Sequence, residues 1–171
     1  RKWWPHITPT SDTFDEVVQW TSAAAANGPV LALSKEGTST LFDVSGAGNK
    51  LVPLIAVPTA EASAVTSFIL NGYHYFAVAE ANSSSMIYRW DGKTETLTSE
   101  VVKLEAATAV AATETADGDM FVLFASRNAG DKSVLCKCAA GGDTDEFICT
   151  KLDLSGVTSM TTLPLTSDEK K

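Results

Sequence analysis

Ser85-Met-Ile-Tyr-Arg-Trp90 is the stretch that decides the fold, because weaker copies of it occur on both sides. Ser39-Thr-Leu-Phe-Asp-Val44 begins 46 residues earlier, and Ser133-Val-Leu-Cys-Lys-Cys138 begins 48 residues later. Turn-forming dipeptides keep nearly the same spacing, at Asn27-Gly28, Asn71-Gly72 and Asp117-Gly118. A period of this length is typical of arrays in which each repeat is one supersecondary unit. The sequence therefore predicts three similar units.

Each unit contains four short apolar runs separated by turns. The second run is apolar at every position, as in Tyr75–Ala79 and Met120–Ala125, which indicates a strand covered on both faces. The fourth run of the first unit contains Pro53, which is tolerated only at the edge of a sheet. We therefore expect four antiparallel strands per unit, with the fourth outermost. This is the blade of a β-propeller, so the fold class is all-β.

The repeat also predicts the domain organisation. The expected segments are an N-terminal arm over 1–14, blades over 15–56, 65–104 and 110–153, and a polar tail over 167–171. Val157-Thr-Ser159 repeats Val65-Thr-Ser67, so we expect one further strand over 157–163, within a propeller segment spanning 15–166. Closed propellers have at least four blades. A second chain should therefore complete the ring, either a processed partner or the mate of a homodimer.

The charge balance and a sequon bear on the partners and the location of the protein. The 171 residues are 44% hydrophobic and carry a net charge of −8, which argues against binding to nucleic acid phosphates. Asn82-Ser-Ser84 is a glycosylation sequon in an expected loop. We expect a glycan at Asn82 and an extracellular location.

The three cysteines predict a disulfide rather than a zinc site, since they have neither CxxC spacing nor histidine partners. If Trp90 faces Leu97 across the third and fourth strands, their equivalents Cys138 and Phe147 also face each other. Antiparallel pairing then places Cys136 opposite Cys149. We therefore expect a Cys136–Cys149 disulfide. Cys138 is left over, and an odd cysteine in a secreted chain suggests an interchain bond.

The middle unit resembles a known repeat. Phe68–Gly72, Tyr75–Ala79 and Ser85–Gly92 are similar to the EAR repeat, also called the EPTP or epitempin repeat, with the strongest resemblance over Val65–Leu104. The flanking units have Val44 and Cys138 at the tryptophan position of the repeat, and Phe42 and Cys136 at its tyrosine position. The resemblance implies a seven-bladed extracellular propeller that binds protein partners and has no catalytic activity. Three units are fewer than that family's ring contains.

The sequence offers little for catalysis. His6 and His74 are its two histidines, and a single strand histidine is more often a core residue than a base. No nucleophile elbow, phosphate loop or HExxH motif occurs. We expect a non-enzyme with no cofactor and no metal.

Three function classes remain: lectin-like recognition of glycans or glycoproteins, protein–protein adhesion or receptor binding, and a structural matrix subunit. Sugar recognition needs polar groups beside an aromatic face. The turns between first and second strands supply these groups in Asn71, Tyr73, Asp117 and Asp119. The alternative is that these residues only form turns, since Asn-Gly and Asp-Gly are strong hairpin signals. Lectin-like recognition is the leading hypothesis.

Overall fold

The computed structural model describes residues 17–22, 29–34, 37–43, 51–128, 130–139, 146–157 and 160. These residues form strands and loops, with no helix among them. The prediction of an all-β antiparallel fold is therefore confirmed for this part of the chain. The expected arm over 1–14, the tail over 167–171 and most of the expected strand over 157–163 lie outside the described residues.

The strands of the described residues form three four-stranded antiparallel sheets, each in chain order. The first sheet contains β1 (Val17–Ser22), β2 (Val30–Ser34), β3 (Ser39–Asp43) and β4 (Val52–Val57). The second contains β5 (Ala62–Leu70), β6 (Tyr73–Glu80), β7 (Ser85–Asp91) and β8 (Thr96–Val102). The third contains β9 (Ala107–Glu114), β10 (Met120–Ser126), β11 (Val134–Cys138) and β12 (Ile148–Lys151).

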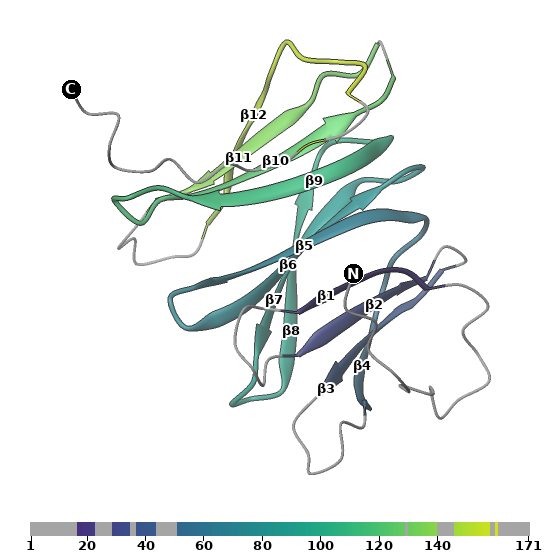
Figure 1. The fold of residues 1–171 in the computed structure, drawn as a ribbon, viewed down its shortest axis with the longest axis vertical. Coiled ribbons are helices and arrows are strands. Elements are labelled where there is room, and N and C mark those ends of the chain that lie inside the picture. Colours follow the sequence, from purple (N-terminus) through teal and green to yellow (C-terminus); the bar gives the residue numbers. More distant parts are fainter. Residues whose placement is uncertain are drawn as a thin grey trace, which may run out of the picture.

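The first strands of the sheets lie next to one another, since β5 contacts both β1 and β9 (Figure 1). The fourth strand of each sheet is its outer edge. Pro53 lies in the edge strand β4, opposite Phe42 and beside a register shift. An edge strand tolerates it, because proline lacks the hydrogen-bond donor that a central strand would need. The second and third sheets begin at Ala62 and Ala107, slightly before the predicted starts at 65 and 110.

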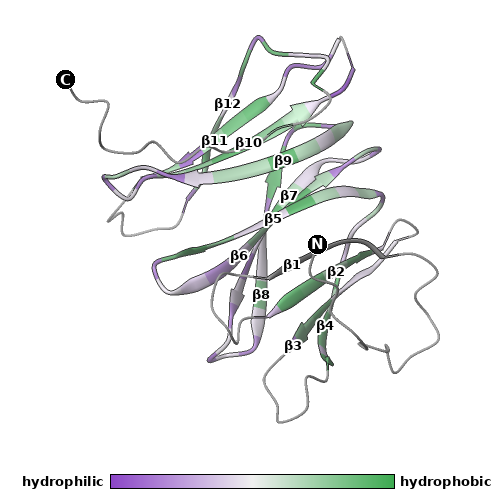
Figure 2. Cartoon of the chain, viewed as in Figure 1, coloured by the Kyte–Doolittle hydropathy of each residue, from purple (hydrophilic) through white to green (hydrophobic). Residues whose placement is uncertain are grey.

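Two hydrophobic cores fill the spaces between the sheets. Residues of the first and second sheets form the first core: Leu31, Leu33, Leu41, Val57, Ala62, Val65, Phe76, Val78, Tyr88 and Trp90. The second core joins the second and third sheets and includes Phe68, Tyr75, Ala77, Ile87, Met120, Val122, Phe124, Val134 and Cys136. Figure 2 shows hydrophobic residues along the strands and hydrophilic ones at the turns.

Strand β6 contributes to both cores, because successive side chains point to opposite faces. Phe76 and Val78 pack in the first core, whereas Tyr75 and Ala77 pack in the second. Full burial of one such large apolar side chain stabilises the fold by about 1.5–3 kcal/mol. The continuous apolar run in the sequence therefore reflects a sheet covered on both sides.

An aromatic cluster joins the second and third sheets. Phe68 and Tyr75 stack with ring centroids 5.2 Å apart, and Phe147 meets them edge-on at 6.0 and 5.9 Å. The hydroxyl of Ser63 on β5 donates a hydrogen bond to the carbonyl of Ala107 on β9, at 2.7 Å. Apolar and polar contacts thus fix the same pair of sheets.

The serine that opens each repeated hexapeptide has the same structural task. Ser39, Ser85 and Ser133 are fully buried, the first two as the first residue of the third strand of their sheets and Ser133 directly before β11. Each Oγ accepts a hydrogen bond from the backbone N–H of the last residue of the second strand. These bonds come from Ser34 at 3.1 Å, Glu80 at 3.2 Å and Ser126 at 3.4 Å.

The same serines also hold the segment that follows the fourth strand. Ser85 Oγ donates to the Leu104 carbonyl at 3.3 Å, and Ser133 Oγ donates to the Leu154 carbonyl at 2.8 Å. Ser39 Oγ shares a hydrogen bond with the Thr59 hydroxyl at 2.8 Å. The repeated serine is therefore explained by hydrogen bonding inside the fold and not by a ligand.

Candidate recognition site

The hairpin between β5 and β6 carries two of the expected ligand-binding residues. Leu70 pairs with Tyr73, so Asn71 and Gly72 form a two-residue turn. Both have positive φ, 49° for Asn71 and 81° for Gly72, as a type I′ turn requires. Asn71 is exposed at the tip, whereas Tyr73 is half-buried against the second core.

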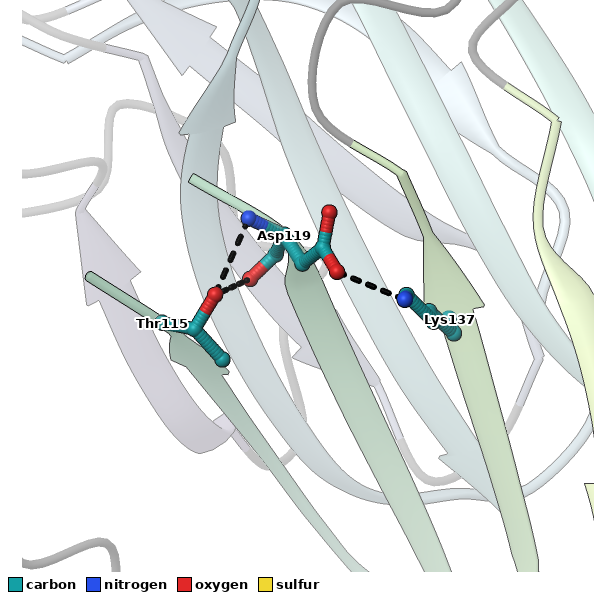
Figure 3. A network of polar contacts seen from close by, with 3 residues as sticks. All are labelled: Thr115, Asp119 and Lys137. Atoms are coloured by element: carbon teal, nitrogen blue, oxygen red, sulfur yellow. Dashed lines mark hydrogen bonds and ion pairs between the residues drawn. The ribbon is translucent and has the colours of Figure 1, made fainter. Parts of the chain in front are cut away.

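The hairpin between β9 and β10 is longer. The Thr115 N–H donates to the Asp119 carbonyl and the Gly118 N–H donates to the Thr115 carbonyl, both at 2.9 Å. Gly118 has φ 86°, a conformation that suits glycine because it lacks a side chain. The Thr115 hydroxyl accepts the Asp119 N–H at 3.1 Å (Figure 3). Asp117 is exposed at the tip.

Two basic side chains anchor these hairpins. The Arg89 guanidinium lies 4.0 Å from the ring centroid of Tyr73, a favourable cation–π contact. The Lys137 ammonium lies 2.6 Å from the Asp119 carboxylate (Figure 3). The sequence interpretation missed both, although the fifth residue of the second and third hexapeptides is basic in each case.

Topology places both hairpins at the same end of neighbouring sheets (Figure 1). We call Asn71, Tyr73, Asp117 and Asp119 the hairpin rim. Asn71 and Asp117 are exposed, and Tyr73 and Asp119 lie against basic side chains. The rim therefore combines exposed polar groups with an aromatic ring that the Arg89 guanidinium contacts.

A cleft of about 850 Å³ lies at the opposite end of the second and third sheets, where the loops β6–β7, β8–β9 and β10–β11 meet. It is lined by Ser84, Lys103, Leu104, Glu105, Gly130, Asp131, Lys132 and Lys151. Lys132 pairs with Asp153 at 3.2 Å. The lining contains both lysines (Lys103, Lys132, Lys151) and carboxylates (Glu105, Asp131), so its charge is mixed.

The arrangement of sheets and hairpins can be compared with known families. Residues 51–91 match the EPTP domain. The resemblance to this repeat is thereby confirmed, although the match begins and ends earlier than the expected Val65–Leu104. No curated protein matches the chain. An EPTP domain indicates an interaction module of the β-propeller type.

The EPTP match is offset from the sheets. It begins beside β4, the edge strand of the first sheet, and ends at Asp91, the last residue of β7 in the second sheet. One EPTP repeat thus contains the outer strand of one sheet and the three inner strands of the next. The repeat therefore contributes side chains to both sides of the first core.

The cysteines of the third sheet form one disulfide, between Cys136 on β11 and Cys149 on β12, which lie opposite each other. Tyr88 and Ser99 pair at the corresponding place in the second sheet, and Trp90 and Leu97, the equivalents of Cys138 and Phe147, pair two residues further along. Cys138 forms no disulfide and is 2% exposed in the second core. An interchain bond at Cys138 does not fit this packing, because its Sγ would have to leave the core.

Three observations bear on the expected glycan and extracellular location. Asn82 is exposed between β6 and β7, where its amide donates a hydrogen bond to the Glu61 carboxylate. Its glycosylation stays a prediction. In the described residues no helix has the length and apolarity needed to cross a membrane. The disulfide is compatible with a secreted protein.

His74 has no feature of an activated base. Its pKa is lowered by burial, which keeps the ring neutral near pH 7. His74 lies opposite Ile69 and Trp90 in the second sheet. This position fits a partly buried strand residue, and the absence of enzymatic activity stays a prediction.

Proposed function

We propose that the protein is an extracellular, non-catalytic recognition module whose three sheets are consecutive blades of a β-propeller. The observation that carries this proposal is the repeated sheet order with adjoining first strands β1, β5 and β9, together with the EPTP match over 51–91. Closed propellers have at least four blades, so further blades would adjoin the three described sheets, and a second chain, either a processed partner or another copy, is the source that we propose.

The leading ligand class is a glycan or glycoprotein bound at the hairpin rim. Exposed Asn71 and Asp117 offer amide and carboxylate groups for sugar hydroxyls, and the fixed ring of Tyr73 offers an apolar surface nearby. Such contacts are individually weak, and several blades acting together raise the avidity. These features support lectin-like recognition.

Protein–protein adhesion is the second candidate, favoured by the EPTP match itself. It would use the same rim without requiring sugar hydroxyls. The two candidates differ in one property: free sugars compete with a glycan ligand and do not compete with a protein surface.

Binding of the full chain to immobilised glycoprotein, with and without simple sugars, tests the proposal. We expect Tyr73→Ala and Asp117→Ala to lower binding at least tenfold, while Lys103→Ala at the opposite end leaves it unchanged. Inhibition by a free sugar supports the lectin-like function, and rim-dependent binding that sugars do not inhibit supports adhesion. If both rim variants fold and bind as the parent does, the rim is not the site.

A further inference from the structure

The cleft at the end of the sheets opposite the hairpin rim gathers lysines from three separate segments. Lys103 directly follows β8, Lys132 lies just before β11, and Lys151 is the last residue of β12. The whole chain carries a net charge of −8, so its overall field does not attract anions. The lysines of the cleft therefore need a local explanation.

The repeat provides a comparison, because the junction between the first and second sheets has the same geometry as the junction that forms the cleft. The third and fourth strands pair in the same register in all three sheets, so equivalent positions follow from the paired residues. Lys103 corresponds to Pro58, Lys132 to Ser84 and Lys151 to Val101. None of these three equivalents carries a charge. The fold is thus built without lysine at these positions, and neither packing nor register requires the lysines of the cleft.

The charges of the lysines are weakly compensated. Lys132 lies 3.2 Å from Asp153, but the two side chains are 56% and 94% exposed, and exposed ion pairs contribute little. Within the described part of the chain, Lys103 and Lys151 form no ion pair. An anion that enters the cleft therefore meets cations that have no strong partner to lose among the described residues.

Hydrogen bonds fix the backbone next to each lysine. The Leu104 carbonyl accepts the N–H and the hydroxyl of Ser85, at 3.1 and 3.3 Å. The Leu152 N–H donates to the Ser133 carbonyl at 2.8 Å. Leu104, Ser133 and Leu152 each directly follow one of the three lysines. The walls of the cleft are therefore held in place before a ligand binds, which lowers the entropy cost of binding.

The β8–β9 loop, which forms one wall, contains a strained residue. Ala106 has φ 58°, a conformation that costs free energy for a residue with a Cβ atom. The Ser126 hydroxyl donates to the Ala106 carbonyl at 3.3 Å. Backbone strain of this kind concentrates at functional sites, and here it directly follows Glu105 of the lining.

The lining also offers hydrogen-bond acceptors. Glu105 and Asp131 are carboxylates, and Ser84 carries a hydroxyl. A ligand with many acidic groups would be repelled by these carboxylates. A sugar with one acidic group presents an anion to the lysines and several hydroxyls to the acceptors. The cleft volume of about 850 Å³ lies in the range of small-molecule sites.

We propose that this cleft binds an acidic sugar whose single carboxylate or sulfate group lies among Lys103, Lys132 and Lys151. Glu105 and Asp131 accept hydrogen bonds from the sugar hydroxyls. The site is separate from the hairpin rim and does not depend on ligand binding there.

Isothermal titration calorimetry of the full chain with sialyllactose, 3′-sulfated lactose and lactose tests the proposal. At least one acidic sugar binds tenfold or more tightly than lactose, and the stronger of the two identifies carboxylate or sulfate as the preferred group. Lys103→Gln and Lys151→Gln each lower the affinity for that sugar at least fivefold, whereas Lys151→Arg keeps it. Lys93→Gln is the matched control, because Lys93 is exposed in the β7–β8 hairpin at the other end of the second sheet. Circular dichroism identifies any variant that fails to fold.

Four results overturn the inference. One is equal affinity for lactose and both acidic sugars, and another is unchanged binding of the acidic sugar in folded Lys103→Gln and Lys151→Gln variants. A third is an equal loss in Lys93→Gln, which would attribute the effect to net charge. The fourth is binding of a triglutamate peptide as tight as that of the acidic sugars, which would assign the cleft to acidic peptides.

The outcomes separate this inference from the proposed function. The immobilised glycoprotein used for the rim carries only neutral glycans, so Lys103→Ala stays an unaffected control there. Tyr73→Ala keeps the affinity for the acidic sugar, because the rim lies at the opposite end of the sheets. Loss of neutral-glycan binding alone contradicts the rim, and failure of the acidic sugars alone contradicts the cleft.

Discussion

Replacing the serine that opens a hexapeptide should destabilise each sheet by a similar amount. In Ser85→Ala the Glu80 N–H loses its acceptor at 3.2 Å inside the fold, since Glu80 is 1% exposed. The Leu104 carbonyl stays satisfied, because the Ser85 N–H also donates to it at 3.1 Å. One buried donor is therefore left without a partner, which costs about 1–3 kcal/mol.

The same reasoning applies to the other two sheets. Ser39→Ala and Ser133→Ala remove the acceptors of the Ser34 and Ser126 N–H groups, so each should cost about 1–3 kcal/mol. For a chain of this size the unfolding temperature falls by roughly 2–4 °C per kcal/mol. Urea denaturation measures the free energy of unfolding directly.

Ser99→Ala is the matched control, since Ser99 is exposed on β8 and such changes stay within about 0.5 kcal/mol. Three buried-serine variants as stable as this control would refute the reasoning. A loss confined to Ser85→Ala would show that the hydrogen bond does not carry equal weight in the three sheets.

Three further predictions concern ionisation and cross-linking. The pKa of Glu80 is raised mainly by burial. Its contribution to stability is therefore full below the ordinary pKa of 4.5 and is lost as the pH rises through the folded-state pKa. Glu80→Gln should flatten the fall in the free energy of unfolding from pH 4.5 to 7, and an unchanged slope would contradict this. Burial and the nearby Glu80 charge raise the pKa of Tyr88 to about 12, so spectrophotometric titration should show a late tyrosine step that Tyr88→Phe removes. Reduction of the Cys136–Cys149 disulfide, which joins residues 13 apart, should lower the free energy of unfolding by about 3 kcal/mol by the loop-entropy relation. The Cys138→Ala variant should keep this contribution under oxidising conditions. Equal urea midpoints with and without dithiothreitol would argue against a stabilising disulfide.

The sheets could be predicted from the sequence, because the turns and apolar runs that define their strands repeat at a regular spacing. Repeated turns and apolar runs set the strand order, and the proline of β4 marked an edge. The pairing of Trp90 with Leu97 placed Cys136 opposite Cys149 by equivalence of the units. Each of these inferences uses backbone register, which a strand pattern determines directly.

The hairpin rim was predicted less completely, because its properties depend on long side chains from other strands. Arg89 reaches the ring of Tyr73 from β7, and Lys137 reaches Asp119 from β11. Neither contact follows from turn chemistry, since both depend on rotamers and on the twist of the sheet. The burial of Cys138 was missed for a related reason: sequence shows which residue is left over and not which core it fills.

The apolar run of β10 can be interpreted by comparison with that of β6. In β6 an uninterrupted apolar run accompanies burial on both faces, under the first and third sheets. Strand β10 has the same kind of run, from Met120 to Ala125, yet in the described part of the chain only its inner side meets another sheet. An antiparallel strand that faced water on its outer side would alternate with polar residues. The sequence of β10 is thus suited to a sheet with neighbours on both sides, and Phe121 and Leu123 are its residues on the side that no described sheet covers.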